Sequence, residues 1–204
     1  MDNMNFKWLK KGQRGPDVIP LLKIEGLTVK VGMRRVLDNL NLQVFEGDHV
    51  LITGPNGCGK STLFNAIMDI PPSKRIRGKI EFKGKDITKL PAHERANLGI
   101  SYMRQIVNIF PGMSVADNLR LALGDDGPER FQREFPEWVE ELTLEKRAGA
   151  LSGGQKKKLA WGMMVLKTNI YMHLLDEPTT GVSLKFLMPE KLTYLLITHE
   201  KTYA

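Results

Sequence analysis

The fold is decided by one stretch of sequence, in which the apolar run His49-Val50-Leu51-Ile52-Thr53 leads directly into Gly54-Pro55-Asn56-Gly57-Cys58-Gly59-Lys60-Ser61. The first part predicts a strand without a polar face, as in a sheet that is covered on both sides. The second part matches the spacing GxxxxGK[ST], in which glycines expose backbone N–H groups to phosphate oxygens at the start of a helix. We therefore predict a phosphate-binding loop between a buried strand and a helix.

Different residues of this loop are predicted to bind the phosphates and the metal ion. Lys60 neutralises the β- and γ-phosphates of a nucleotide, and Ser61 is a ligand of Mg²⁺. The other residues expected to contact the phosphates are Gly54, Pro55, Asn56, Gly57, Cys58, Gly59 and Thr62. A glycine-rich turn without a ligand is the weaker alternative, because this loop follows a buried strand and opens a helix. The sequence has 1 Cys and no Cys or His cluster at zinc-ligand spacing, so any metal is expected to have oxygen ligands.

A second apolar strand, predicted at residues 170–175, ends in the carboxylates Asp176 and Glu177. A parallel α/β sheet presents its ligand-binding edge at the carboxyl ends of its strands. We expect Asp176 to hold Mg²⁺ through water, and Glu177 to orient or deprotonate the attacking water. His173 interrupts the apolar run and is interpreted as a core histidine that is satisfied by a hydrogen bond.

The rest of the chain predicts an α/β core with a helical insertion. Residues 22–31 and 39–45 alternate with period two and are expected to form antiparallel neighbours. Helices are predicted at 62–69, 114–123 (capped by Ser114), 137–142 and from Ser152 to about 167, and further strands at 79–83, 99–103 and 194–198. Residues 1–20 are read as a tail or a loosely docked extension, because they are polar and interrupted by Gly and Pro.

The pentapeptide Leu151-Ser152-Gly153-Gly154-Gln155 selects among phosphate-loop proteins. It predicts a Ser-capped helix with exposed backbone N–H groups, which is a second phosphate-binding feature. Here the sequence resembles the ATP-binding cassette (ABC) ATPases, over about residues 22–200. The resemblance implies a head-to-tail dimer, in which this segment of one subunit closes over the ATP of the other. It also implies that Gln105 contacts Mg²⁺ or the attacking water, and that His199 contacts the γ-phosphate.

The resemblance further implies the fold and its partners. It implies an ABC-type core with an antiparallel β subdomain, within a domain at 21–204, and an α-helical subdomain inserted at about 106–165. The expected partners are a second ABC ATPase subunit, identical or different, and transporter membrane subunits, at the cytoplasmic face of the cell membrane. The segments 108–115 and 181–183 resemble the branched-chain amino-acid importers in particular.

Three features depart from the family pattern. Val31 precedes Gly32, where the family carries an aromatic residue that stacks on adenine. The aspartate expected after the catalytic glutamate is absent from 181–185, and the interval from Glu177 to His199 is short. The short interval, and the end of the chain five residues after His199, predict a truncated C-terminus. The three departures leave open the alternative of a degenerate domain with weak or no ATPase activity.

Composition and charge bear on whether the chain spans a membrane, is secreted or binds nucleic acid. With 204 residues, 42% hydrophobic and 26% charged, the chain is ordinary globular protein, and no apolar run is long enough for a membrane-spanning helix. Without a secretory signal, a cytosolic location is expected. The net charge of +7 permits a soluble ABC ATPase that acts on nucleic acid. Since the basic residues are dispersed without interleaved aromatics, no direct nucleic-acid partner is expected.

Overall fold

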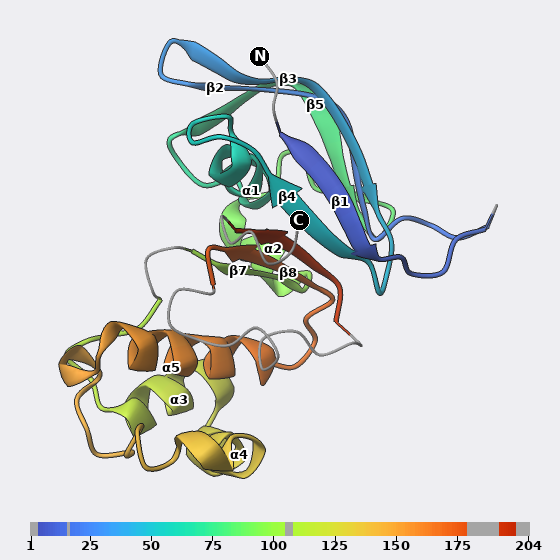
Figure 1. The fold of residues 1–204 in the computed structure, drawn as a ribbon. Coiled ribbons are helices and arrows are strands. Elements are labelled where there is room, and N and C mark those ends of the chain that lie inside the picture. The colour runs from blue at the N-terminus through green and yellow to red at the C-terminus, as the bar shows by residue number, and fades with distance from the viewer. Residues whose placement is uncertain (1–3, 16, 105–107, 179–191, 199–204) are drawn as a thin grey trace. The chain divides into compact units, whose positions relative to one another are not determined.

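The structure is a computed structural model that describes residues 4–15, 17–104, 108–178 and 192–198. The chain forms two compact units. The first comprises Met1–Tyr102, Ile170–Asp176 and Glu190–Ala204, and the second comprises Met103–Asn169 and Glu177–Pro189. Figure 1 labels most of their helices and strands.

The first unit holds two sheets. Among the described residues, one has the strand order β1-β4-β9-β8-β7, from Asn5–Lys10, His49–Thr53, Tyr194–Ile197, Met172–Asp176 and Ile100–Met103. The other has the order β3-β2-β5-β6, from Arg34–Val44, Leu22–Val31, Ser73–Phe82 and Lys85–Asp86. Strands β4, β9 and β8 are parallel, whereas β2 pairs antiparallel with β3 and β5. The predicted α/β fold is confirmed, as is the antiparallel pairing of residues 22–31 with 39–45.

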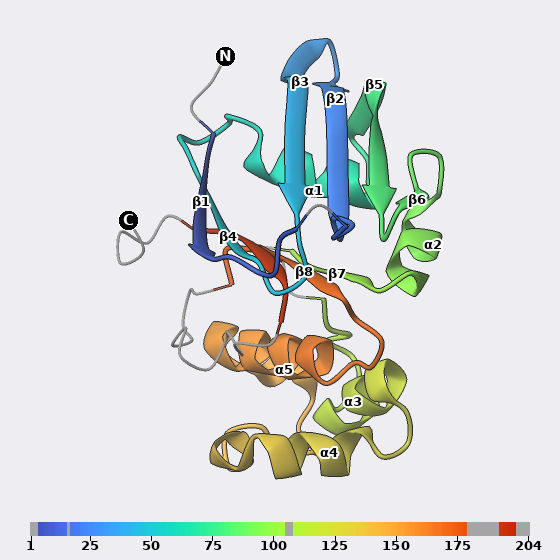
Figure 2. The ribbon, with the colours of Figure 1, turned by 90° about the vertical axis from the view of Figure 1, so that its right-hand side faces the viewer.

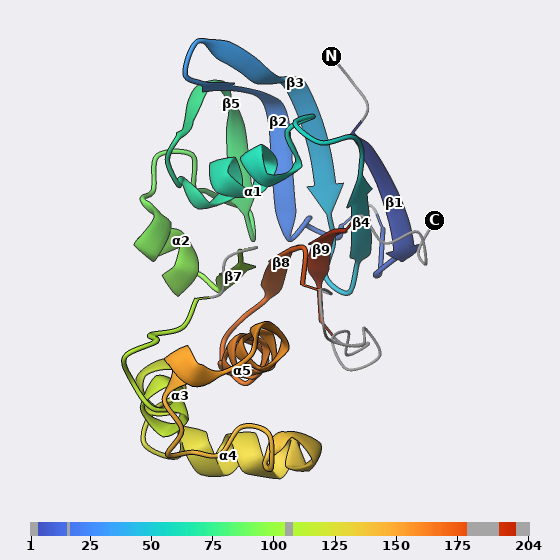
Figure 3. The same ribbon diagram turned by 60° about the vertical axis from the view of Figure 1, so that its left-hand side comes forward.

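The two sheets share one hydrophobic core with the helix α1 (Lys60–Met68). Leu63, Phe64 and Ile67 of α1 are fully buried, together with side chains of β2, β4, β8 and β9. Figure 3 shows α1 next to β2 and β5 of the four-stranded sheet. This packing fixes the start of α1, and therefore the loop before it, against the end of β4.

The N-terminal residues differ from the expected tail. Asn5–Lys10 form β1, which pairs antiparallel with β4 at the edge of its sheet, as Figure 2 shows. Phe6 and Trp8 pack against the core, but this strand has too few apolar residues to be recognised from its periodicity. The N-terminal segment is held instead by hydrogen bonds to the carboxylate of Asp48.

Asp48 is completely buried and ties this N-terminal segment to the sheet. Its Oδ1 accepts hydrogen bonds from Gly12 N (2.7 Å) and Arg14 Nη2 (3.1 Å). Its Oδ2 accepts from Arg14 Nη2 (2.8 Å), Trp8 Nε1 (3.1 Å) and Phe45 N (2.9 Å). A buried carboxylate with this many donors is well compensated for its lost hydration.

A buried arginine secures the other end of α1. Arg95, in the short helix α2 (Ala92–Asn97), is 1% exposed, and its guanidinium donates to the carbonyls of Ala66 (2.9 Å), Ile67 (2.8 Å), Leu90 (2.7 Å) and Thr88 (3.1 Å). The last carbonyls of a helix have no intrahelical partner, so Arg95 supplies donors that α1 itself lacks. Burial lowers the pKa of Arg95.

His173 in β8 differs in one respect from the interpretation of a satisfied core histidine. It is 2% exposed, but its Nδ1 has no hydrogen-bond partner among the described residues. Burial lowers its pKa to about 4, because the charged imidazolium is poorly solvated there. His173 is thus a neutral core residue that is packed rather than hydrogen-bonded through Nδ1.

The second unit is helical. It contains α3 (Val115–Leu123), α4 (Gly127–Glu134) and α5 (Gly153–Val165), with the short 3₁₀ turns Pro136–Trp138 and Ala148–Ala150. Residues 137–142 do not form the predicted helix. The chain instead starts α4 with Pro128 in its first turn, where a proline costs no hydrogen bond. The predicted Ser114 cap is confirmed, because Ser114 Oγ accepts from Asp117 N at 3.0 Å.

Candidate nucleotide-binding site

The loop between β4 and α1 has a backbone that depends on its glycines. Gly59 caps α1 with φ 110° and Gly57 has φ 76°, both in the region that side chains disfavour. A Cβ at Gly59 would lie 2.9 Å from both Val36 Cγ1 and Leu37 Cδ2 of β3. Strand β3 therefore packs directly against this loop, and only a glycine allows that approach.

Lys60 is the cation of the loop. Its side chain is largely buried, at 7% exposed, and its Nζ donates to the carbonyls of Gly54 (2.7 Å) and Pro55 (3.1 Å). Within the described residues, no carboxylate lies at ion-pair distance from this ammonium group. The loop therefore combines an unneutralised positive charge with the N-terminus of α1, and both features favour an anion.

The strand register places Asp176 at the same edge of the sheet as the loop. Ile197 of β9 pairs with Ile52 of β4 on one side and with Asp176 of β8 on the other. Since neighbouring strands are about 4.8 Å apart, the ends of β4 and β8 are about 10 Å apart at this level. Asp176 is 6% exposed. The sheet thus brings a cation and a carboxylate, far apart in sequence, to one edge.

Tyr102 joins the end of β8 to α1, a role that no sequence pattern predicts. Its hydroxyl lies 3.3 Å from Asn65 Oδ1 and 3.5 Å from Asp176 Oδ2. Asn65 is one helical turn after Ser61, so the hydroxyl contact and the predicted metal ligand lie on the same face of α1. Tyr102 and Asn65 are thereby added to the surroundings of the candidate site.

Glu177 has an unusual backbone. Its φ is +53°, in the left-handed region that costs a non-glycine residue about 1–2 kcal/mol. Its carbonyl oxygen accepts a hydrogen bond from Lys157 Nζ of α5 at 3.2 Å. Burial lowers the pKa of Lys157, against an opposing effect of the Glu177 carboxylate. Observed strain of this kind is concentrated at functional sites.

The segment 151–155 begins α5 with a reciprocal cap. Ser152 Oγ accepts from Gln155 N at 3.2 Å, and Gln155 Oε1 accepts from Ser152 N at 3.0 Å. A Cβ at Gly153 would meet no atom within 4 Å. The predicted Ser152 cap is therefore confirmed, and open space adjoins the backbone at Gly153. Gln105 and His199, the other two predicted site residues, lie outside the described residues.

The residues present fit a nucleotide with a hard metal ion. The loop offers a lysine, backbone N–H groups and the Ser61 hydroxyl, and the sheet edge offers the Asp176 carboxylate. No cluster of three or more His, Cys, Asp or Glu residues exists in the described part of the chain. Mg²⁺ does not need such a cluster, because it is held by one or two protein oxygens together with substrate phosphates and water.

A parallel sheet whose carboxyl edge carries a glycine-rich loop, a lysine and a strand-terminal carboxylate defines a phosphate-loop nucleotide-binding fold. The chain belongs to the ABC transporter family, because residues 37–180 match the family model described as ABC transporter. None of the helices in the described ranges is long and apolar enough to span a membrane.

Relatives support this assignment. The lipopolysaccharide export system ATP-binding protein LptB of Escherichia coli is 38% identical over 156 residues, which cover 73% of this chain and 64% of LptB. The probable branched-chain amino acid transport ATP-binding protein LivF of Archaeoglobus fulgidus is 34% identical over 159 residues, 74% of this chain and 65% of LivF. The chain spans 57% to 65% of the length of the first curated relatives that it matches.

A solved structure agrees with these relatives. The ADP conformation of MJ1267, an ATP-binding cassette of an ABC transporter, has a TM-score of 0.70 and 29% identity to this chain. The match covers 89% of this chain and 82% of MJ1267. The ABC-type fold expected from the sequence is therefore confirmed.

Proposed function

We propose that this chain binds Mg-ATP and hydrolyses it as the nucleotide-binding subunit of an ABC transporter. The observation that carries the proposal is Lys60, which has no carboxylate at ion-pair distance in the described part of the chain and lies in a glycine loop level with Asp176 at one sheet edge. Family membership supports the choice of ATP, as does the ADP form of MJ1267. The names LptB and LivF support transport, and they point to different substrates.

The loop residues would bind the phosphates. Backbone N–H groups of residues 54–62, except Pro55, which has none, would surround the phosphate oxygens, and Lys60 would exchange its carbonyl partners for the β- and γ-phosphates. Ser61 and Asp176 would hold Mg²⁺, with Gln105 as a further ligand from the family pattern. When bound, Mg²⁺ supplies positive charge to the phosphate oxygens.

Hydrolysis would depend on Glu177. Its carboxylate orients the attacking water or takes a proton from it, with Gln105 and His199 assigned from motif order as partners around the γ-phosphate. The hydrogen bond that Lys157 donates to the Glu177 carbonyl would help to keep the Glu177 backbone in its left-handed conformation. Lys157 is therefore proposed to position Glu177.

The segment 152–155 would act on a second subunit. Ser152 and Gln155 cap α5 by bonding to each other. The neighbouring N–H groups in the first turn of α5 would donate hydrogen bonds to phosphate oxygens from outside the chain. The proposal therefore includes a dimer, identical or mixed, with membrane subunits as partners and a peripheral position on the cytoplasmic side. The second compact unit is proposed to be the helical subdomain of a domain that spans residues 21–204.

A thermal-shift titration with Mg-ATP, followed by phosphate release, tests the proposal. At a ligand concentration of 100 times Kd, binding stabilises a protein by about 2.7 kcal/mol. We expect a rise in Tm and steady phosphate release for the wild type, and loss of both for Lys60→Ala. Lys85→Ala, which removes an exposed lysine of β6, is the matched control. If the wild type shows neither binding nor release, the proposal is wrong and the degenerate-domain alternative holds.

A further inference from the structure

Strand pairing gathers basic residues at one end of the four-stranded sheet, although they lie far apart in the sequence. Lys30 of β2 pairs with Arg35 of β3 on one side and with Lys74 of β5 on the other. Residues that pair directly across antiparallel strands point to the same face of a sheet, so these three cations form one row. Figure 2 shows the β2–β3 connection and the start of β5 at this same end.

The row lies on the face of the sheet that points away from the hydrophobic core. Val29, next to Lys30, is fully buried in that core, and successive side chains of a strand alternate between the two faces. Arg77 adds a fourth cation to the outer face, because it pairs with Thr28, two residues before Lys30. The Arg77 side chain is 64% exposed. We call the four cations the basic face: Lys30, Arg35, Lys74 and Arg77.

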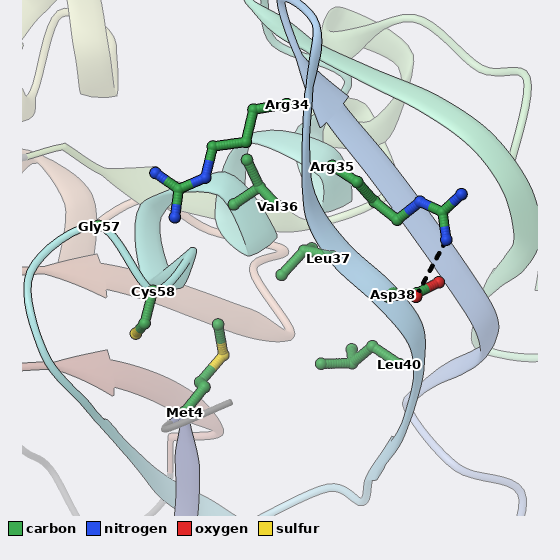
Figure 4. Close-up of a pocket in the computed structure, with 9 residues that line it drawn as sticks. All are labelled: Met4, Arg34, Arg35, Val36, Leu37, Asp38, Leu40, Gly57 and Cys58. Atoms are coloured by element: carbon green, nitrogen blue, oxygen red, sulfur yellow. Dashed lines mark hydrogen bonds and ion pairs between the residues drawn. The ribbon is translucent and has the colours of Figure 1, made fainter. Parts of the chain in front are cut away.

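Arg34 is directed differently and is not part of the basic face. Figure 4 shows that the Arg34 and Arg35 side chains extend from β3 in opposite directions. Arg34 extends toward the phosphate loop, where it lines a pocket of about 450 Å³ together with Gly57 and Cys58. Variants of the outer lysines therefore leave the loop side of β3 unchanged.

The basic face carries more positive charge than its neighbours neutralise. Among the described residues, the carboxylate at ion-pair distance from it is Asp38, which lies 3.1 Å from Arg35 Nη1 and 3.8 Å from Arg77 Nη2. Lys30 and Lys74 make no ion pair in the described part of the chain. Like charges directly opposite each other destabilise a sheet, so a negatively charged partner would relieve this repulsion.

The other end of the same outer face is balanced. There, Lys23 lies 2.8 Å from Glu25, and Lys79 forms an ion pair with Glu81. The excess charge is therefore confined to the end of the sheet near the β2–β3 turn. This end is the part of the sheet that would attract an anionic partner.

Exposed apolar side chains lie beside the basic face. Met33, in the β2–β3 turn, is 94% exposed, and Ile76 of β5 is 48% exposed. Residues 28–38 and 73–77 contain no aromatic residue that could stack on nucleic-acid bases. Cations around protruding apolar side chains are instead typical of surfaces that bind the interface of an anionic membrane.

We propose that the basic face docks on the anionic headgroups of a membrane leaflet, with Met33 inserted at the level of the headgroups. A leaflet presents many negative charges in one plane, so it neutralises the four cations together while they stay hydrated. The apolar contact of Met33 adds to this electrostatic attraction. The inference goes beyond the proposed function, because lipid binding of this kind requires no nucleotide.

Cosedimentation with lipid vesicles tests the proposal. The vesicles contain phosphatidylcholine alone, or an equimolar mixture of phosphatidylcholine and phosphatidylglycerol, at physiological ionic strength. We expect the wild-type chain to bind the mixed vesicles and not the neutral ones. Lys30→Ala/Lys74→Ala should weaken this binding about thirtyfold, because each basic residue near an anionic leaflet contributes about fivefold. Met33→Ser should weaken it about fivefold, through the lost apolar contact.

The matched control is Lys23→Ala/Lys79→Ala, which removes the same charge from the balanced end of the same face. It should bind the mixed vesicles like the wild type. Thermal unfolding checks that all variants are folded. The change at Lys30 and Lys74 should cost no stability, because it removes cations that oppose each other across the strands.

Several results would overturn the proposal. Wild-type protein that ignores the mixed vesicles would remove it, and equal weakening in both double variants would show that binding follows net charge rather than the basic face. Full binding by Met33→Ser would exclude the insertion of Met33. Binding of a labelled RNA duplex without vesicle binding, measured by fluorescence anisotropy, would make the basic face a nucleic-acid surface instead. Mg-ATP binding is measured separately, so none of these results decides the proposed function.

Discussion

The ammonium group of Lys60 donates a 2.7 Å hydrogen bond to the carbonyl oxygen of Gly54, the first residue of the phosphate loop. A second bond, to Pro55, closes the loop around its own cation. Charged phosphate oxygens are stronger acceptors than neutral carbonyls. A bound nucleotide would therefore replace hydrogen bonds to two neutral carbonyls, and among the described residues no ion pair of Lys60 would have to break.

Glu177 allows hydrolysis to be separated from binding. We expect Glu177→Gln to keep ATP binding and to slow phosphate release about a hundredfold or more, because an amide cannot act as a base. Glu177→Gly should be equally inactive and at least as stable, since glycine adopts a φ of +53° without strain. Phosphate release and urea unfolding measure the two effects. Parent-rate hydrolysis by Glu177→Gln would contradict the role given to Glu177.

Arg95 should contribute strongly to stability. Arg95→Met leaves the carbonyls of Ala66, Ile67, Leu90 and Thr88 without these donors, so we expect a loss of about 2–4 kcal/mol in the free energy of unfolding. Urea unfolding measures it. The matched control is Arg120→Met, which removes an exposed i,i+3 ion pair and should cost less than about 0.5 kcal/mol. Equal costs for the two variants would show that the buried hydrogen bonds of Arg95 carry no special weight.

Asp48 should hold the N-terminal segment in place. Asp48→Asn replaces one acceptor oxygen with a donor and removes the charge that pairs with Arg14, so we expect β1 to detach more often. Trypsin cleavage at Lys10 and Lys11 should then accelerate, as followed by mass spectrometry of the released N-terminus. Arg14→Ala is expected to show a smaller acceleration, because the bonds from Gly12, Trp8 and Phe45 remain. Wild-type cleavage kinetics in Asp48→Asn would mean that β1 stays docked without this carboxylate.

His173 should make stability depend on pH. Its folded pKa, about 4, is below the ordinary 6.5, so the unfolded state binds more protons between these values. Stability should therefore fall as pH drops from 6.5 and level off near 4, by a total of about 3 kcal/mol. His173→Leu should flatten this part of the curve, because it removes the titrating group and a buried nitrogen without a partner.

Urea unfolding at pH 7, 5.5 and 4.5 measures this slope. His93→Gln, which replaces an exposed histidine of α2, is the control and should keep the wild-type slope. An unchanged slope in His173→Leu would assign the pH dependence to other groups.

Features that depend only on residues close together along the chain could be predicted from the amino-acid sequence. The phosphate loop and the caps at Ser114 and Ser152 were predicted because each is built within one short segment, where glycine conformation and side-chain reach suffice. Most strands followed from their alternation. The prediction failed where the local signal was weak, as in Asn5–Lys10, and where a helix was predicted at 137–142 but formed at Gly127–Glu134.

Tertiary structure alone decided the relationships between distant residues. The burial of Arg95 under α1, the anchoring of the N-terminus by Asp48 and the meeting of Tyr102 with Asn65 and Asp176 each join segments tens of residues apart. The pocket beside Arg34 likewise requires β3 to pack on the loop. No local pattern encodes these contacts, because their energy arises only when packing of the core removes both partners from water.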